Sequence, residues 1–305
     1  MFTPASFVDP REVDAVLDDL LSVPWPPGVE AARVHYDDLG PPIADDIRIE
    51  PIASAGVAGQ FLTPPLADPA RAVIFMHGGG YVFGSLKSHG GLAAEVARAA
   101  RCRTLQLDYR RAPEHPHPAA VEDACAAYRL LLADGIAPGR IAFVGDSAGG
   151  GLVVAALVAL RDAGLPLPGA TVCLSPWVDL EATGESYETR KHIDPMVERE
   201  TVDLVRKLYL NGIDPRTPTA SPLFADLTGF PPFLIQVGER EILFSDAERL
   251  AAKARASGLD VTFEEWPALY HVWHLQFPVL SAARVAIARI GEFIRQHTES
   301  QGGAQ

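Results

Sequence analysis

Ser147 lies in the segment Gly145–Gly150, which reads GDSAGG and stands between an apolar strand-like run and an apolar helix-like stretch. A Gly-x-Ser-x-Gly pattern in this context is typical of a sharp turn that exposes the serine hydroxyl at the carboxyl end of a strand. The turn is so tight that the neighbouring residues must be small, as they are here. Ser147 is therefore predicted to be a nucleophile that attacks a carbonyl carbon.

A run of three glycines in His77–Tyr81, which reads HGGGY, follows another apolar run. When a carbonyl is attacked, its oxygen becomes negatively charged, and N–H donors that are already in place stabilise it. We expect the N–H groups of Gly79, Gly80 and Ala148 to form such an oxyanion hole. A phosphate-binding loop is a poor alternative, because the glycine spacing only approximates a dinucleotide fingerprint and no P-loop lysine follows.

The base that activates the serine should follow it in the chain, on the loop that leaves the last strand. Of the nine histidines, His271 is the first after the last predicted strand, residues 261–266. His274 is expected on the following helix or packed nearby. His77 precedes Ser147 and is expected to brace the glycine loop by hydrogen bonding.

A carboxylate that orients the imidazole should lie on the loop after the preceding strand, within residues 238–246. Glu239, Glu241 and Asp246 all qualify by position. Asp246 also suits the first turn of the helix that follows. Spacing alone leaves the choice between Glu241 and Asp246 open.

Strand-like runs alternate with helical patterns along most of the chain. After a hairpin of residues 47–50 and 57–62, strands are predicted at 72–76, 104–109, 140–144, 170–174, 232–237 and 261–266. Helices are predicted at 92–100, 119–133, 148–163, 246–257 and 282–295. This alternation predicts an α/β fold with a mostly parallel, eight-stranded sheet and helices on both of its faces.

Two segments fall outside the alternation. Residues 1–45 contain a helical pattern at 11–21 but are too few to hold a core of their own. Residues 179–214 are too long for a connecting loop, and insertions of this length are usually functional. We expect one domain, residues 1–305, in which these two segments form a helical cap over the edge of the sheet.

Composition limits the class of protein. The 305 residues are 48% hydrophobic and 21% charged, as in ordinary globular proteins. The net charge of −13 argues against nucleic acid and anionic membranes as partners. We find no signal peptide, no run long enough to span a membrane, and only three scattered cysteines. A cytoplasmic protein without a metal or cofactor is therefore expected.

As a set, these motifs resemble the hormone-sensitive-lipase family of α/β-hydrolases, also called the GDXG or bacterial family IV lipolytic enzymes. The resemblance is carried by His77–Gly80, Asp108–Pro116, Gly145–Gly150, Ser221–Leu223 and His271. In that family the acid begins an Asp-x-Leu motif, which falls here on Glu241–Leu243. The resemblance therefore indicates Glu241 as the acid, although the family's usual residue is aspartate.

The resemblance also implies a helical cap, a substrate pocket and a homodimer formed through sheet edges. Candidates for lining the pocket are Tyr81, Trp177, Met196, Val205 and Tyr209, for each of which ordinary core packing is an equal alternative.

The predicted activity is that of a serine carboxylesterase for short- to medium-chain esters, including lactones, acting through an acyl-enzyme. Amidase or peptidase activity would use the same machinery and stays open. A non-catalytic ligand-binding protein on the same fold is the other alternative, and the presence of Ser147, His271 and a nearby acid disfavours it.

Overall fold

One sheet runs through the molecule in the computed structural model, which describes residues 2–54 and 56–299. Within these residues the sheet has eight strands in the order β1-β2-β4-β3-β5-β6-β7-β8. The strands are β1 Arg48–Ser54, β2 Val57–Thr63, β3 Asp68–Met76, β4 Cys102–Leu107, β5 Ile141–Asp146, β6 Ala170–Leu174, β7 Phe233–Gly238 and β8 Val261–Trp266. β2 runs antiparallel to both β1 and β4, and the remaining pairs are parallel. The predicted fold class is confirmed.

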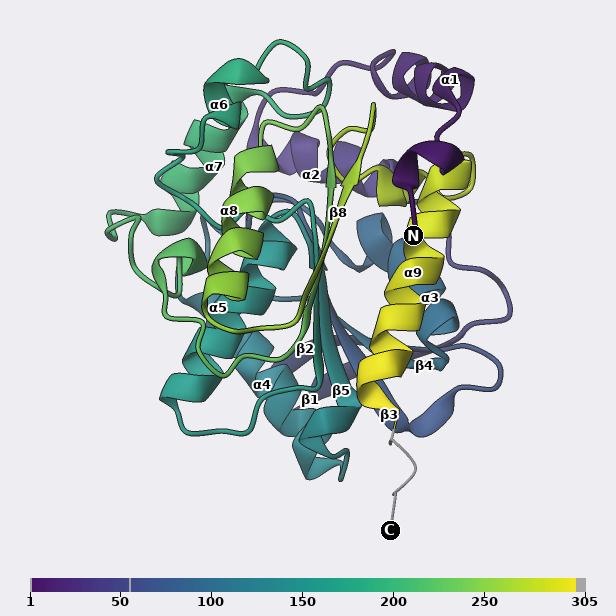
Figure 1. The fold of residues 1–305 in the computed structure, drawn as a ribbon, viewed down its shortest axis with the longest axis vertical. Coiled ribbons are helices and arrows are strands. Elements are labelled where there is room, and N and C mark those ends of the chain that lie inside the picture. The colour runs from purple at the N-terminus through teal and green to yellow at the C-terminus, as the bar shows by residue number, and fades with distance from the viewer. Residues whose placement is uncertain (1, 55, 300–305) are drawn as a thin grey trace.

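Helices cover both faces of the sheet, α3 and α9 on one face and α4, α5 and α8 on the other (Figure 1). The helices are α1 Pro10–Leu20, α2 Val29–Asp38, α3 Leu86–Ala100, α4 Ala119–Ala133, α5 Ala148–Asp162, α6 Ser186–Thr189, α7 Arg199–Leu210, α8 Phe244–Ala256 and α9 Ser281–Thr298. In β3, Val73 and Phe75 belong to the core under α3 and α9, whereas Ile74 and Met76 belong to the core on the opposite face. Because both faces are buried, the strand is a continuous apolar run.

Helices α3 and α2 differ from the prediction in an instructive way. The helix predicted to begin at residue 92 begins at Leu86, because the hydroxyl of Ser85 accepts hydrogen bonds from the N–H groups of Lys87 and Ser88 and so caps an earlier turn. Helix α2 was not predicted at all. Among its residues only Ala32 is buried, so its sequence lacks an apolar face that could reveal it.

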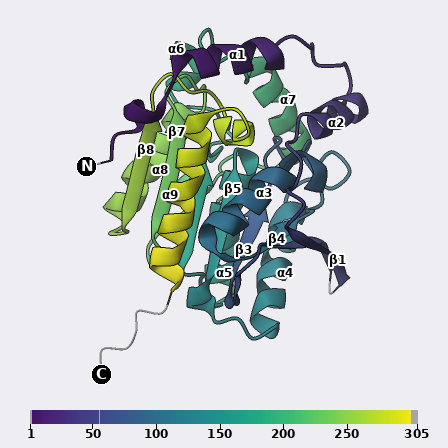
Figure 2. The same cartoon turned by 90° about the vertical axis from the view of Figure 1, so that its right-hand side faces the viewer.

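The N-terminal segment, residues 2–45, and the insertion, residues 179–214, lie at the carboxyl end of the parallel strands. Figure 2 shows α1, α2 and α7 along this end of the molecule, above the sheet. The insertion leaves the sheet after β6 and returns before β7. Both segments therefore border the edge where open α/β sheets hold their binding sites.

Candidate active site

Ser147 occupies the sharp turn between β5, which ends at Asp146, and α5, which begins at Ala148. Its backbone has φ of 54° and ψ of −121°, a conformation that residues with a side chain rarely adopt. The turn closes because Gly149 lies against β3, where a Cβ atom would stand 2.0 Å from the carbonyl oxygen of Met76. The serine hydroxyl is thereby held at the end of the strand.

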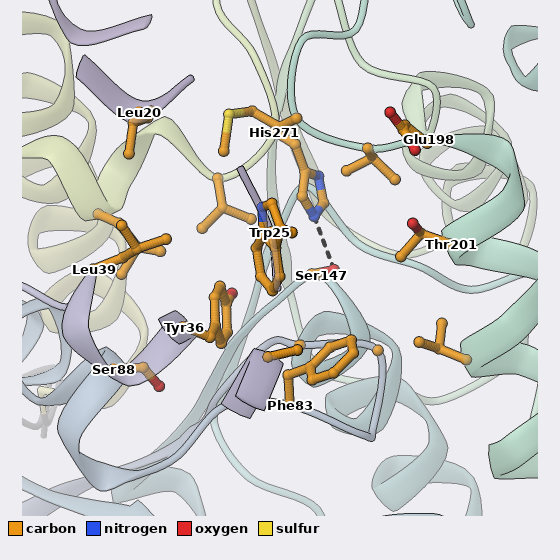
Figure 3. Close-up of a pocket in the computed structure, with 18 of the residues that line it drawn as sticks. Leu20, Trp25, Tyr36, Leu39, Phe83, Ser88, Ser147, Glu198, Thr201 and His271 are labelled. Carbon is orange, nitrogen blue, oxygen red and sulfur yellow. Dashed lines mark hydrogen bonds between the residues drawn. The ribbon is translucent and has the colours of Figure 1, made fainter. Parts of the chain in front are cut away.

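His271 joins this hydroxyl to a carboxylate. Its Nε2 atom is 2.9 Å from Ser147 Oγ, the contact drawn in Figure 3. Its Nδ1 atom is 2.9 Å from Oε2 of Glu241. Since a carboxylate accepts, Nδ1 carries the proton, and Nε2 is free to accept the proton of the serine hydroxyl.

Glu241 is fully buried and fixed through its second oxygen. Oε1 accepts hydrogen bonds from the N–H of Gly238 at 2.6 Å and from the hydroxyl of Ser175 at 2.7 Å. With Oε2 on His271, both carboxylate oxygens are engaged, so the side chain has one preferred orientation. Ser175 could not have been predicted from the sequence, where nothing distinguishes it from an ordinary strand-end serine.

Asp246, the alternative acid, lies elsewhere. Its Oδ2 atom accepts hydrogen bonds from the N–H groups of Val178 and Asp179, at 3.0 and 2.9 Å. Arg249 contacts both Asp179 and Asp246, at 2.8 and 3.2 Å. Burial, together with the charge of Asp179, raises the pKa of Asp246 to about 7. This carboxyl holds the start of the insertion against α8, and Glu241 is the acid that contacts the imidazole.

The electrostatic surroundings of His271 favour its protonated form. Burial alone would lower the pKa of His271, but the hydrogen bond and charge of Glu241 and the charges of Asp194 and Asp146 outweigh burial and raise it above 6.5. An imidazole in such surroundings is a stronger base than a free one. The arrangement is thus suited to removing a proton from the serine hydroxyl.

The glycine loop after β3 presents unpaired N–H groups. Gly79 and Gly80 have φ of 106° and 61°. Within the described part of the chain, the N–H groups of Gly79, Gly80 and Ala148 have no hydrogen-bond partner. Both glycines line the pocket beside Ser147. Three free donors next to a serine hydroxyl could together stabilise an oxyanion.

Asp146 and His77 hold this loop. The N–H of Gly78 donates to Oδ1 of Asp146 at 3.1 Å, and Nδ1 of His77 donates to the carbonyl of Gly78 at 2.8 Å. Burial lowers the pKa of His77 to about 3, so the ring is neutral and serves as a structural donor. Asp146 stands inside the serine motif, but its spacing gave no sign that its side chain reaches the glycine loop.

A cavity of about 620 Å³ opens above Ser147, bounded by both the N-terminal segment and the insertion. Figure 3 shows Trp25, Leu20 and Leu39 on one side of the serine and Glu198 and Thr201 on the other. Its volume matches that of small-molecule sites, and most of its lining is apolar.

Of the candidate lining residues, Trp177, Met196 and Val205 border the cavity. Tyr81 and Tyr209 do not; their rings are fully buried and stack on each other with centroids 3.7 Å apart. The expectation that Tyr81 binds substrate is therefore wrong. Its backbone has a φ of 61°, and its ring packs on that of Tyr209 in α7.

Residues 2–54 and 56–299 contain neither a candidate metal cluster nor a helix able to span a membrane. No cluster of three or more His, Cys, Asp or Glu side chains there is arranged to hold a metal ion. In the same residues, no helix is both long and apolar enough to cross a membrane.

Comparison with known proteins agrees with this geometry. A family model described as the alpha/beta hydrolase fold matches residues 73–275. An acetyl-hydrolase of Streptomyces hygroscopicus is 47% identical over 277 residues, which cover 88% of this chain and 91% of that protein. An esterase of Acinetobacter venetianus is 34% identical, with 81% of this chain and 82% of that protein covered.

Solved structures of esterases are also similar to this chain in fold and in sequence. An esterase from the bacterial hormone-sensitive lipase family has a TM-score of 0.92 and 49% identity, with 95% of this chain and 99% of that chain covered. The esterase EstE5, in a crystal soaked with p-nitrophenyl butyrate, has a TM-score of 0.92 and 42% identity, with 96% and 100% covered. The fold, the turn at Ser147 and the similarity to these relatives show that the chain belongs to the hormone-sensitive-lipase family of α/β-hydrolases and is a carboxylic ester hydrolase.

Proposed function

We propose that this carboxylesterase hydrolyses short- to medium-chain esters through a triad of Ser147, His271 and Glu241. The observation that carries the proposal is the continuous hydrogen-bond chain from the serine hydroxyl to the buried carboxylate, at 2.9 Å for each imidazole contact. The serine end of this chain opens into the cavity, where an ester can reach it.

In the first half of the reaction, Ser147 Oγ attacks the ester carbonyl carbon while Nε2 of His271 takes the hydroxyl proton. The carbonyl oxygen becomes an oxyanion, to which Gly79, Gly80 and Ala148 would each donate an N–H. The oxyanion then collapses, the bond to the alcohol breaks, and His271 gives its proton to the departing oxygen. An acyl-enzyme on Ser147 and a free alcohol result.

In the second half, a water molecule repeats the attack on the acyl-enzyme. His271 accepts the water's proton and returns it to Ser147 Oγ as the acid leaves. Glu241 keeps Nδ1 protonated in both halves and stabilises the positive imidazolium without taking its proton. Every proton that leaves a reactant is thus returned, and the reaction needs only water.

Lactones are esters closed into rings, and we include them in the proposed substrate class. The mainly apolar cavity of about 620 Å³ has room for a ring as well as for a linear chain. Ring opening would follow the same steps, except that the alcohol stays attached to the acyl group.

Ser147→Ala tests the proposal. The variant removes the attacking oxygen and little else, so we expect hydrolysis of p-nitrophenyl acetate and p-nitrophenyl butyrate to fall by a factor of about 10⁴ or more. The same pair of proteins should be assayed on a panel of linear esters and lactones. Retention of most of the activity by the variant would rule out Ser147 as the nucleophile.

We further propose a cytoplasmic location. All three cysteines, Cys102, Cys125 and Cys173, are free and buried, as is usual for proteins of reducing compartments. Fractionation of the native host with an antibody against the protein would test this, and recovery outside the cytoplasm would contradict it.

A homodimer through the edge of the sheet is the remaining part of the proposal. β8 is the last strand of the sheet, and Val261, Thr262 and Phe263 on it are only half-buried. An edge strand offers unpaired N–H and C=O groups to a second copy. Light scattering after gel filtration should give twice the mass of one chain, and a single-chain mass at micromolar concentration would contradict the dimer.

A further inference from the structure

Asp194 lies in the insertion, between α6 and α7, and its carboxylate reaches the loop that carries Glu241. Its Oδ2 atom accepts a hydrogen bond from the N–H of Ile242 at 2.8 Å. Ile242 directly follows Glu241 in the chain and is fully buried. This hydrogen bond therefore fixes the backbone next to the acid from outside the acid's own loop.

The other oxygen of Asp194 organises the wall of the cavity. Oδ1 accepts hydrogen bonds from the N–H groups of Met196 and Val197, at 2.9 and 3.1 Å. Both residues line the cavity above Ser147. One carboxylate thus joins the substrate-facing part of the insertion to the loop that positions His271.

Asp194 also adds negative charge beside the imidazole. It is one of three carboxylates whose charge favours the protonated form of His271, the others being Glu241 and Asp146. His274 lies in the short helix Trp273–Gln276 after His271, and burial lowers its pKa to about 3, so it is neutral in the working range. Burial raises the pKa of Asp194 itself, and the nearby His271 opposes that rise.

We propose that Asp194 is a positioning residue of the esterase, which couples the insertion to the triad by holding the loop of Glu241 and by stabilising the imidazolium form of His271. The inference rests on the proposed triad. The insertion then has two roles, because it shapes the cavity and also sets the strength of the base.

The chain offers a matched control in Asp214, at the other end of the insertion. Like Asp194, it is followed by a proline, and its Oδ1 atom accepts a hydrogen bond from the N–H two residues on, that of Arg216, at 2.9 Å. Asp214 is exposed and borders neither the cavity nor the loop of Glu241. Asp214→Asn removes the same charge from the same kind of turn without touching the triad.

The experiment compares Asp194→Asn with Asp214→Asn by measuring kcat and KM for p-nitrophenyl butyrate from pH 5 to 9. Esterase activity requires neutral His271, so kcat/KM falls as the pH is lowered through the pKa of this residue. Loss of the Asp194 charge should lower that pKa and move the acid-side midpoint down by roughly half a unit or more. A weaker base should also lower kcat on the plateau, by about threefold to tenfold. Asp214→Asn should change neither value.

Asp194→Glu distinguishes the effect of the charge of Asp194 from the effect of its structural contacts. It also provides the test if Asp194→Asn does not fold. The glutamate keeps the charge, so the midpoint should stay at the wild-type pH even if the longer side chain lowers kcat. A midpoint that is unchanged in folded Asp194→Asn, or one that shifts as far in Asp194→Glu, would overturn the proposal. Failure of the wild-type protein to hydrolyse any ester would instead contradict the proposed function itself.

Discussion

The imidazole of His271 is held from both sides, by the hydroxyl of Ser147 and by the carboxylate of Glu241. Glu241 is itself held by hydrogen bonds from Gly238 and Ser175. These two residues do not contact Ser147, but through Glu241 they fix the orientation of the imidazole. The glutamate stands where the family has an aspartate. The glutamate side chain is wholly buried, and its second oxygen is anchored to the strand end.

The roles of the two candidate acids can be separated by mutation. Glu241→Ala leaves His271 without its orienting partner, and we expect kcat for p-nitrophenyl butyrate to fall by about 10³-fold to 10⁴-fold. Asp246→Ala leaves the N–H groups of Val178 and Asp179 unpaired, which should lower the free energy of unfolding by roughly 1–3 kcal/mol per lost group. The turnover of the protein that remains folded should change less than tenfold. A larger loss of kcat from Asp246→Ala would reverse the assignment.

The pH profile of the wild-type protein follows from the surroundings of His271. Its pKa is raised because the partner carboxylates outweigh burial, and in the proposed mechanism the neutral ring is the active form. The activity kcat/KM should therefore decline on the acid side with a midpoint above about 6.5, the value of a free histidine. The measurement is kcat/KM from pH 5 to 9 in buffers of constant ionic strength, and a midpoint below 6 would disagree with this electrostatic account.

At the scale of elements, the loops that carry the site come from distant parts of the chain and meet because parallel strands end at one edge. Helix α7 adds a contact from above, since a Cβ atom at Gly80 would lie 2.8 Å from Val205 and Tyr81 stacks on Tyr209. The glycine loop is therefore packed against the insertion. The insertion contacts both this loop and, through Asp194, the loop of Glu241.

The N-terminal segment lines the cavity through Trp25, whose ring lies beside Tyr36 and Phe83. Trp25→Ala removes apolar surface that would contact the acyl chain of a substrate equally in the ground state and the transition state. We expect KM for p-nitrophenyl hexanoate to rise about tenfold with little change in kcat. Val34→Ala is the control, since Val34 is an exposed apolar residue of the same segment outside the cavity lining. A drop in kcat at constant KM would contradict a pure binding role.

Most strands and long helices could be predicted because their apolar residues repeat at the period of the element. Helix α4 and strand β8 occur at the predicted residues, Ala119–Ala133 and Val261–Trp266. Helix α2 could not be predicted in this way, since its residues are mostly outside the core. Helix α2 faces the cavity with Val29, Ala32 and Tyr36 and places only Ala32 among the buried residues, so its sequence shows little periodicity.

Only those residues of the site that belong to a recognisable sequence motif could be predicted. Ser147, His271 and the glycines stand at strand ends in a fixed order, and the structure brings them together. Spacing could not choose between Glu241 and Asp246, because both lie within reach of the same strand end. The prediction for Tyr81 was wrong because its ring packs on that of Tyr209, a residue distant in the chain whose contact is not visible in residue types. Asp194 was missed because its partner, Ile242, lies 48 positions away.

At the scale of the whole molecule, the protein carries a net charge of −13. Among the described residues, the lining of the cavity includes Glu198 but no lysine or arginine. A field of this sign attracts cationic substrates, and salt screens it. Butyrylcholine and its neutral isostere 3,3-dimethylbutyl butyrate should therefore respond differently to salt. Between 20 and 500 mM NaCl, we expect the ratio of their kcat/KM values to fall severalfold. A ratio that does not depend on salt would show that the negative charge of the protein has no effect on substrates in the cavity.

Ser147 is proposed to be an activated nucleophile, and covalent labelling tests this activation most directly. A fluorophosphonate should add once per chain, with the adduct mapped by mass spectrometry to the peptide that contains Ser147. Ser147→Ala should take up no label, and His271→Ala should react at least a hundredfold more slowly, because the serine is then not activated. Labelling of another residue, or equal rates in the wild type and His271→Ala, would contradict the account.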